Sequence, residues 1–467
     1  MKHPLHRLAA PIICLGLTAC AVGPDYHRPP PQALLSFKEQ GGWKASQPAD
    51  VFDHGPWWSI FDDPVLDSLE KQIDISNQNL KASQDAYQQA RALVMQARNA
   101  YWPTVGVTAD RQRSNSGVGG AVQTVNSAGA TGSWTLDIWG GTRRTVENQR
   151  DTALASQAAV AQARLSAQAS VASDYFELRA QDSLRKLLQD AVDDEQQALK
   201  ITEARFKHGV AARADVVSAE TQLLTSQAAL VNVELTRGQL EHALAVLVGR
   251  TPADFQLDAA LLRTDVPSVP PGVPSTLLER RPDIAEAERQ MAAANAQIGV
   301  AVSAFFPSLT LGGSATYSST GLRGLLGASN GVWAVGPELA ATLFDVEGRR
   351  AVVRQARAAY AEAIDNYRQT VISGFQQVED NLLALRVLER EGAIESDAVM
   401  AAREAEKLTL DQYKAGTVPY TSVITAQTTT LSSEETALTV LEDRLTASVA
   451  LIQAVGGGWS AAQLAQD

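Results

Sequence analysis

The feature of this sequence that most constrains its fold is an internal duplication. Four short segments recur in the same order, each about two hundred residues further along the chain. The matching pairs are Ala100–Pro103 with Ala304–Pro307, Leu178–Arg179 with Leu385–Arg386, Phe206–Gly209 with Tyr413–Gly416, and Leu247–Gly249 with Ala454–Gly456. Solenoid repeats are only ~20–45 residues long, so the chain is predicted to contain one long supersecondary unit twice.

Each copy is predicted to run helix, strand, loop, strand, very long helix, turn, helix. In the first copy, a helical pattern from about residue 65 to residue 100 leads into a strand, and a loop rich in Gly, Ser and Asn spans 114–127. The segment from Gly140 to about Lys207 contains no proline. A continuous helix of that length would approach ~100 Å at roughly 1.5 Å per residue. Its many alanines, with Leu184 and Leu188 at a four-residue step, predict coiled-coil-like packing.

The predicted strands alternate between apolar and polar residues. In the first of them, Val105 and Val107 alternate with Thr104 and Thr108. This pattern fits a sheet packed on a core, and it also fits a membrane barrel with lipid outside and water inside. The predicted ranges are 104–112, 129–139, 308–318 and 332–344.

Aromatic pairs stand directly before the first strand of each copy, Tyr101 with Trp102 and Phe305 with Phe306. An interfacial aromatic belt would lie at these positions, which favours the membrane barrel over the alternative that they are ordinary core aromatics. The smallest closed membrane barrels use about eight strands, whereas this chain has four predicted strands. Because open sheet edges do not occur in lipid, several chains are predicted to share one barrel.

The N-terminus has the features of an export signal. Lys2 and Arg7 precede an apolar run, Leu8–Leu17, that is too short to span a bilayer. Leu17–Cys20 resembles a lipobox, so residues 1–19 are predicted to be a lipoprotein signal peptide and Cys20 to carry acyl chains such as palmitate. The alternative is an ordinary small-residue cleavage site. Ala21, which is not aspartate, favours delivery to the outer membrane, and the mature chain keeps too few cysteines for an internal disulfide.

Charge and motifs argue against several other classes of protein. The formal net charge is −12 and the pI is about 5.1, which is unsuitable for binding nucleic acid. The six histidines show no metal-ligand spacing, and the chain has no glycine-rich phosphate loop or nucleophile motif. We therefore expect no enzyme activity, no metal site and no cofactor other than the lipid at Cys20.

Three motifs resemble those of a known family, the TolC-like outer-membrane efflux proteins, and within it the lipoprotein branch similar to OprM and NodT. They are Val22–Tyr26 with Pro29 after Cys20, Trp57-Trp58 with Phe61–Pro64, and Glu279–Ile284 continuing to Pro307. The resemblance covers essentially the whole mature chain. It divides the chain into a lipidated segment at 20–64, a first repeat at 65–250, a linker at 251–273, a second repeat at 274–457 and a tail at 458–467.

The resemblance implies a fold that is mainly α with a membrane β-barrel. Three identical chains would form one twelve-stranded outer-membrane barrel, with four strands from each chain, continued by a long periplasmic α-helical barrel. Pro103 and Pro307 would then be the points where helix changes to strand, since proline cannot continue a helix. Phe305 and Phe306, with Tyr101 and Trp102, would mark the membrane surface.

The function implied by the resemblance is passive. The channel would be the exit duct of a tripartite efflux system, in contact with a periplasmic adaptor protein, an inner-membrane pump of the RND type and outer-membrane lipid. Drugs (multidrug resistance), metal ions and aromatic acids all remain possible substrates. A periplasmic adaptor or fibrous coiled-coil protein is the remaining alternative, and neither explains the duplication.

The resemblance also assigns a gate to the helical turns near Gly209 and Gly416, the expected periplasmic tips. Asp215 and Tyr413 match tip positions that hold the closed state by polar contacts in the family. Their alternatives are a helix cap for Asp215 and tip packing for Tyr413. Where relatives place an arginine or acidic groups on the second tip, this chain has Val418, Ser422 and Thr425, so a carboxylate ring at the entrance is not expected.

Overall fold

The computed structural model describes residues 21–28, 38, 56–115, 121–269 and 280–465. The signal peptide and Cys20 lie outside the described residues. The chain divides into two compact units. The strand unit comprises Met1–Pro30, Asp85–Gln157 and Glu286–Gln369, and the helical unit comprises Pro31–Gln84, Ala158–Ala285 and Thr370–Asp467.

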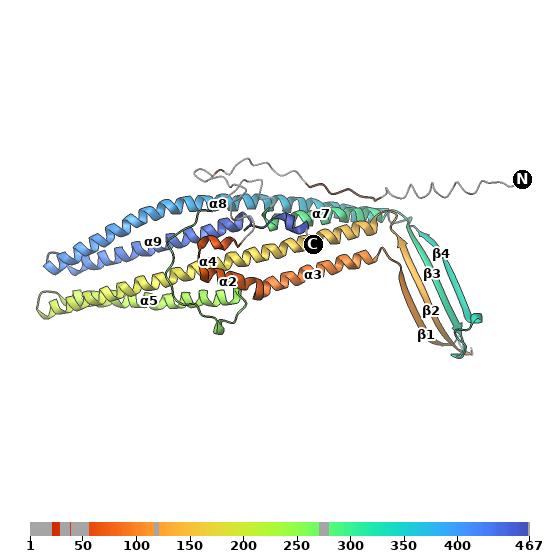
Figure 1. The fold of residues 1–467 in the computed structure, drawn as a ribbon, viewed down its shortest axis with the longest axis horizontal. Coiled ribbons are helices and arrows are strands. Elements are labelled where there is room, and N and C mark those ends of the chain that lie inside the picture. Colours follow the sequence, from red (N-terminus) through yellow and green to blue (C-terminus); the bar gives the residue numbers. More distant parts are fainter. Residues whose placement is uncertain (1–20, 29–37, 39–55, 116–120, 270–279, 466–467) are drawn as a thin grey trace. The chain divides into compact units, whose positions relative to one another are not determined.

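The strand unit contains one antiparallel sheet in the order β1-β2-β3-β4 (Figure 1). Its strands are β1 (Thr104–Asn115), β2 (Val122–Leu136), β3 (Ser308–Ser319) and β4 (Gly331–Ala340). The sheet joins the two copies of the repeat, because β2 of the first copy pairs with β3 of the second.

The predicted strand boundaries differ from the observed ones at both ends of β2 and at the end of β4. Most of the predicted loop at 114–127 is strand, since β2 already begins at Val122 and pairs with β1 there, and with β3 from Asn126 onward. Backbone pairing thus overrides the turn preference of Gly, Ser and Asn. At the other end, β2 stops at Leu136 instead of 139 and β4 at Ala340 instead of 344. The β3–β4 ladder ends at Ser308, because Pro307 before it has no N–H to donate.

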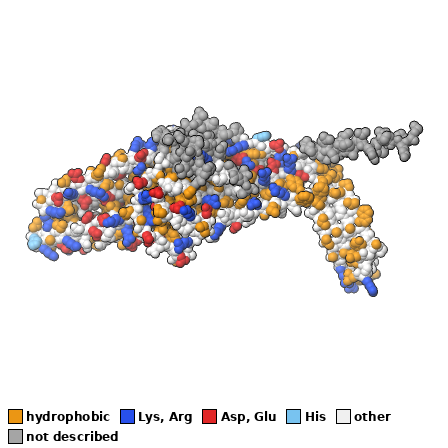
Figure 2. Space-filling model, viewed as in Figure 1, with side chains coloured by type: hydrophobic (Ala, Val, Ile, Leu, Met, Phe, Trp, Pro, Cys, Tyr) orange, Lys and Arg blue, Asp and Glu red, His pale blue; other side chains and the backbone are white. Residues whose placement is uncertain are grey.

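The strand register separates an apolar face from a polar face. Val107 lies opposite Ala130, which lies opposite Ala315, which in turn lies opposite Trp333. The next row, on the other face, begins with Thr108 beside Gly129 and Thr316. Figure 2 shows hydrophobic side chains spread over the visible face of the strands. The period of two in the sequence therefore corresponds to two faces of one sheet.

The helices account for most of the fold, and four of them, α3, α4, α7 and α8, contribute residues to both units. They are α2 (Pro64–Ser76), α3 (Gln78–Asn99), α4 (Gly141–Lys207), α5 (Arg213–Leu247), α7 (Pro282–Ser303), α8 (Val346–Ala415) and α9 (Tyr420–Ala454). In the helical unit α4 runs antiparallel to α5, and α8 to α9 (Figure 1). Short 3-10 turns, η3 (Trp57–Phe61), η4 (Pro252–Asp254), η5 (Ala328–Asn330) and η6 (Ala461–Ala465), complete the described elements. Of the helices in the described ranges, none combines the length and the apolar character needed to cross a membrane.

The predicted single helix from 65 to 100 is in fact two helices, which meet at Asn77. The backbone of Asn77 is extended, and its Oδ1 accepts a hydrogen bond from the N–H of Leu80 at 2.9 Å, which caps α3. Its Nδ2 donates to the carbonyl of Leu247 at 2.7 Å, near the end of α5. A polar residue inside a helical pattern therefore marks a break, because its side chain serves two helix ends.

The second copy makes the same connection with a different residue. Arg281 donates from its guanidinium to the carbonyl of Ala454 at 2.8 Å, near the end of α9. The same side chain bonds both carboxylate oxygens of Asp283, at 3.0 and 2.6 Å, and the Gln377 oxygen at 2.9 Å. This explains the Arg-Arg-Pro-Asp motif in physical terms: its second arginine ties the start of α7 to the end of α9.

Candidate functional site

Two regions carry the residues that the sequence singled out, and the first is the helix-to-strand junction of the strand unit. α3 ends at Asn99 and β1 begins at Thr104; α7 ends at Ser303 and β3 begins at Ser308. Both connections contain i→i−3 turns. The N–H of Trp102 donates to the carbonyl of Asn99, and the N–H of Phe306 donates to the carbonyl of Ser303, each at 3.1 Å. The prolines follow directly, so the backbone changes from helix to strand within four residues.

The four aromatic residues at this junction are all exposed in the single chain, Trp102 the most at 72%. Two tryptophans that were not predicted as junction residues hold the aromatic pairs in place by ring stacking and by hydrogen bonds. Trp139 stacks on Phe306 with ring centroids 4.7 Å apart, and its Nε1 donates to the carbonyl of Pro307 at 2.7 Å. Trp134 donates likewise to the carbonyl of Tyr101 at 3.0 Å. Trp139 stands at the end of the predicted strand 129–139, and Trp134 lies within it.

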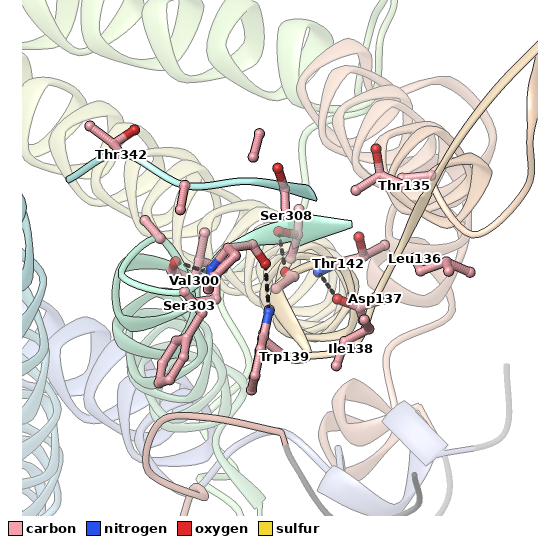
Figure 3. Close-up of a pocket in the computed structure, with 18 of the residues that line it drawn as sticks. Thr135, Leu136, Asp137, Ile138, Trp139, Thr142, Val300, Ser303, Ser308 and Thr342 are labelled. Atoms are coloured by element: carbon pink, nitrogen blue, oxygen red, sulfur yellow. Dashed lines mark hydrogen bonds between the residues drawn. The ribbon is translucent and has the colours of Figure 1, made fainter. Parts of the chain in front are cut away.

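A cavity of about 580 Å³ opens beside this junction (Figure 3). Thr135, Trp139, Ser303 and Ser308 are among its lining residues. At its edge Asp137 accepts hydrogen bonds from the N–H groups of Thr142 and Arg143, at 2.9 and 2.8 Å. These bonds cap the first turn of α4, where the backbone N–H groups have no partner within the helix. The start of the long helix is thereby fixed to the end of β2.

The segment Ala21–Arg28, here called the N-terminal strap, is held against the strand unit. Val22 N–H donates to the carbonyl of Trp139 at 3.0 Å. The buried guanidinium of Arg144 donates to Asp25 at 2.7 Å and also contacts the carbonyl of Val22. The hydrogen bond from Arg144 and then its positive charge lower the pKa of the Asp25 carboxyl.

The second half of the strap contacts α7. Asn295 donates to the carbonyl of Pro24 at 3.1 Å, and the Tyr26 hydroxyl donates to Glu288 at 2.7 Å. Burial raises the pKa of the Tyr26 hydroxyl, and the hydrogen bond to Glu288 raises it further. The Val-Gly-Pro-Asp-Tyr motif is therefore a docking sequence, because its polar groups find partners on two helices. Arg144 and Asn295 could not be identified from the sequence alone.

The second region is formed by the two hairpin tips of the helical unit. Ala198 and Ala219 from the first hairpin and Tyr413, Tyr420 and Val423 from the second form a buried cluster, here called the tip cluster. The rings of Tyr413 and Tyr420 lie 5.2 Å apart. The hairpins are thus joined by an apolar contact between small side chains and aromatic ones.

Arg205 adds a polar contact between the hairpins. Its guanidinium donates to the carbonyls of Tyr413 and Lys414 at 2.9 and 3.1 Å, and it lies 4.6 Å from the centre of the Tyr413 ring. These carbonyls end α8, where a cation is favourable because of the helix dipole. The sequence prediction missed Arg205, although it directly precedes the recurring turn motif.

Asp215 and Tyr413 each have contacts within the single chain. The Asp215 carboxylate accepts from the N–H of Ala212 at 3.1 Å, which is a capping contact at the start of α5. The Tyr413 hydroxyl lies 3.3 Å from the Thr202 hydroxyl, and its ring is 3% exposed. Both observations agree with the alternatives of helix capping and tip packing. Contacts of these two residues with neighbouring chains stay predictions.

The remaining tip residues lie on the second hairpin. Val418 packs against the tip cluster, Ser422 is half-buried in the first turn of α9, and the exposed Thr425 bonds back to the carbonyl of Thr421 at 3.0 Å. Across the described ranges, no group of three or more His, Cys, Asp or Glu side chains is arranged to hold a metal ion.

This architecture is that of an outer-membrane efflux channel, and the chain belongs to the outer membrane efflux protein family. The family model, described as "Outer membrane efflux protein", matches residues 69–250 and 273–457. The match includes both copies of the repeat, so the alternative of a periplasmic adaptor or fibrous protein is set aside.

Individual relatives match along nearly their whole length. The toluene efflux pump outer membrane protein TtgC of Pseudomonas putida is 29% identical over 472 residues, which covers 98% of this chain and 96% of TtgC. The pyoverdine export outer membrane protein OpmQ of Pseudomonas aeruginosa is 30% identical over 458 residues, covering 96% and 95%. The solved structure of the outer-membrane channel OprN superposes with a TM-score of 0.85 at 26% identity, covering 94% of this chain and 100% of OprN.

Proposed function

We propose that this protein is the exit duct of a tripartite efflux system and conducts substrates passively through the outer membrane. The observation that carries the proposal is a sheet with one apolar and one polar face, whose strands β2 and β4 lead directly into helices of 67 and 70 residues, α4 and α8. Such a sheet suits a membrane barrel, and such helices suit a periplasmic tube. A periplasmic adaptor and an inner-membrane pump, of the RND type, would supply energy and substrate selection, and the chain would carry out no catalysis.

The two faces of β1 provide a direct test. Val107 and Thr108 are neighbours that point to opposite faces, and both are exposed in the single chain. An arginine on the lipid-facing side of a barrel costs ~2–4 kcal/mol at the bilayer midplane, whereas a lumen position tolerates it. Val107→Arg should therefore reduce the amount of protein assembled in the outer membrane, and the matched Thr108→Arg should not. Equal assembly of the two variants would contradict the proposed membrane face.

A homotrimer follows from the edges of the sheet. β1 and β4 are its outer strands, and an open edge cannot stay unpaired in lipid. We infer that three chains contribute four strands each to one twelve-stranded barrel. The mass of the detergent-extracted assembly should equal three chains, and a monomer with full strand content would contradict a shared barrel.

Lipid anchoring at Cys20 is a further part of the proposal. The strap begins one residue after Cys20 and is tied to the strand unit by Val22 and Asp25, which would keep an acylated N-terminus beside the junction aromatics. Intact-mass analysis should find a diacylglyceryl-modified Cys20, and an unmodified mature chain that begins elsewhere would overturn this assignment. Cys20→Ser should still trimerise if it is exported, because the trimer is closed by packing between chains.

The substrate is proposed only as a class of exported small molecules. TtgC is named for toluene and OpmQ for pyoverdine, so relatives of similar identity differ in cargo. Metal-ion or aromatic-acid export by the same channel is the alternative to multidrug efflux. A deletion strain complemented with the wild-type gene and challenged with each class would distinguish them.

A further inference from the structure

The end of the sheet that is farther from Pro103 and Pro307 carries positive charge. Arg111 and Arg113 lie near the end of β1, and Arg323 lies in the connection from β3 to β4. Because β1 and β3 both run antiparallel to β2, these residues come to the same end of the sheet. All three are exposed and are here called the arginine rim. Figure 2 shows basic side chains at this end of the strands, beyond hydrophobic ones.

Arg111 and Arg113 lie on the apolar face of the sheet. Successive side chains of a strand point to opposite faces, so on β1 the two arginines share a face with Val105 and Val107. This face thus changes from apolar to basic along a single strand. In a membrane barrel the apolar face contacts lipid, whereas the other face lines the lumen.

The apolar face ends at the same level on the neighbouring strands. Ala109 lies in one row with Ala128 of β2 and Tyr317 of β3. The next row on this face is polar and consists of Arg111, Asn126 and Ser319. At ~3.3 Å per residue and a tilt of ~40°, the 12 residues of β3 cover roughly 30 Å of height, and the apolar band of outer-membrane barrels is ~25 Å tall. In the proposed barrel Arg111 therefore lies where the apolar band ends.

The arginine rim has no carboxylate beside it on this face. The sequence contains no Asp or Glu from Arg111 to Leu136 or from Ser308 to Pro337, so the edge strand of a neighbouring copy would bring none either. Asp110 belongs to the opposite face of β1, and its carboxylate accepts a hydrogen bond from the Ser127 hydroxyl. In a chain with a formal net charge of −12, the rim is a local excess of positive charge, which attracts anions.

We propose that the arginine rim binds the phosphate groups of anionic lipids in the outer leaflet of the outer membrane, an inference that rests on the proposed channel function. In that channel the long helices lie in the periplasm, so the opposite end of the sheet meets the outer leaflet. Guanidinium groups match phosphate in charge and in bidentate hydrogen-bond geometry. The acyl chains of the same lipid pack on Val105 and Val107, a contact that a soluble anion does not gain.

The test measures lipid binding to the detergent-extracted, full-length protein by native mass spectrometry. The wild-type protein should retain diphosphoryl lipid A, a phosphate-bearing anionic lipid, at concentrations at which zwitterionic phosphatidylcholine is lost. Arg111→Gln with Arg113→Gln should weaken this binding roughly tenfold or more. The matched control, Arg213→Gln with Arg390→Gln, removes the same charge at two exposed positions of the helical unit and should leave binding unchanged.

An exchange of two neighbouring residues separates the effect of the face from that of the charge. Arg111→Gln with Gln112→Arg keeps the net charge and the composition but moves one guanidinium to the opposite face of β1, where a barrel lumen tolerates it. This variant should bind lipid A severalfold more weakly than the wild type. Circular dichroism and the mass of the assembly verify that each variant keeps its fold.

Equal binding of lipid A by the wild type and the Arg111–Arg113 double variant would overturn the inference, and so would wild-type affinity in the exchange variant. Millimolar inorganic phosphate should not displace the lipid, and complete displacement would show that the rim takes free phosphate instead. A wild-type protein that failed to insert into phosphatidylcholine vesicles would contradict the proposed channel itself. Insertion without a preference for lipid A would contradict only the lipid site, so the two failures are distinguishable.

Discussion

The two hairpin tips share one backbone and differ in their side chains. In the first tip, the N–H of Gly209 donates to the carbonyl of Phe206, and the N–H of Val210 donates to the carbonyl of Arg205. In the second tip, Gly416 and Thr417 donate to the equivalent carbonyls three and five residues earlier. Both sets form a Schellman turn around a glycine with positive φ, 74° and 79°. Phe206 is nevertheless 41% exposed, whereas Tyr413 at the same position of the repeat is 3% exposed.

This difference shows how a duplicated unit can pack against itself. Two identical tips would offer each other the same surface. Here the second tip supplies Tyr413 and Tyr420, and the first supplies small alanines and the cation Arg205. The duplication has kept the turn, and substitution has made the two halves complementary.

The largest expected effect comes from exchanging the aromatic residues for alanine. Tyr413→Ala should destabilise the packing of the two hairpins by ~3–5 kcal/mol, as for other buried aromatics. Phe206→Ala should cost only about 0.5 kcal/mol, the usual range for surface substitutions. Amide exchange at the helix ends near the tips measures both changes. Similar losses would show that Phe206 is buried in the assembled channel and that the tips differ less than the single chain suggests.

The shared turn predicts an equal effect at both tips. Alanine in place of Gly209 or Gly416 must adopt a left-handed backbone, which costs about 1–2 kcal/mol. Near Gly416 the added Cβ would meet Arg205 at 3.7 Å, an ordinary contact, and near Gly209 it would meet nothing within 4 Å. Thermal unfolding of the two variants should therefore shift by similar amounts. A much larger shift for one of them would show that the turns are not equivalent.

The two tips also differ at the predicted gate position, where the first tip has Asp215 and the second has Ser422. This difference allows a test of channel function. Removing one hydrogen bond costs about 0.5–1.5 kcal/mol, and the symmetry of the proposed trimer would triple the effect. The double variant Asp215→Ala with Tyr413→Phe should raise planar-bilayer conductance while thermal stability stays near that of the parent. Unchanged conductance with faster amide exchange at the start of α5 would assign Asp215 to helix capping alone.

A pH-dependent effect is expected from Glu442, on α9 of the second hairpin. Burial, followed by the charges of Glu177 and Asp443, raises the pKa of Glu442 from 4.5 to about 7. The folded protein therefore binds this proton more tightly than the unfolded chain does. Its stabilising contribution is complete below about pH 4.5 and is lost as the pH rises to about 7. Urea unfolding should show a shallower fall in stability over this range for Glu442→Gln, and an unchanged fall would contradict the assignment.

The sequence predicted the features that repeat and missed those that depend on distant partners. The duplication, the two proline junctions and the alternation of faces are all local patterns with a clear period. The helix break at Asn77, the roles of Arg281 and Arg205, and the docking of Asp25 on Arg144 join residues between 119 and 208 positions apart. A single sequence does not reveal such pairs, and the extended β2 was missed because pairing outweighed composition.

The docking of the N-terminal strap sets an order of events during synthesis. The strap is among the first segments made, yet the partners of Tyr26 and Pro24 lie 262 and 271 residues later, on α7 of the second repeat. Contacts of such sequence separation form late, because the entropy of closing the loop must be offset first. The strap can reach its full set of contacts only after much of the second copy has been exported. A nascent chain that contains the first copy alone can therefore form the contacts of Val22 and Asp25 but not those of Pro24 and Tyr26.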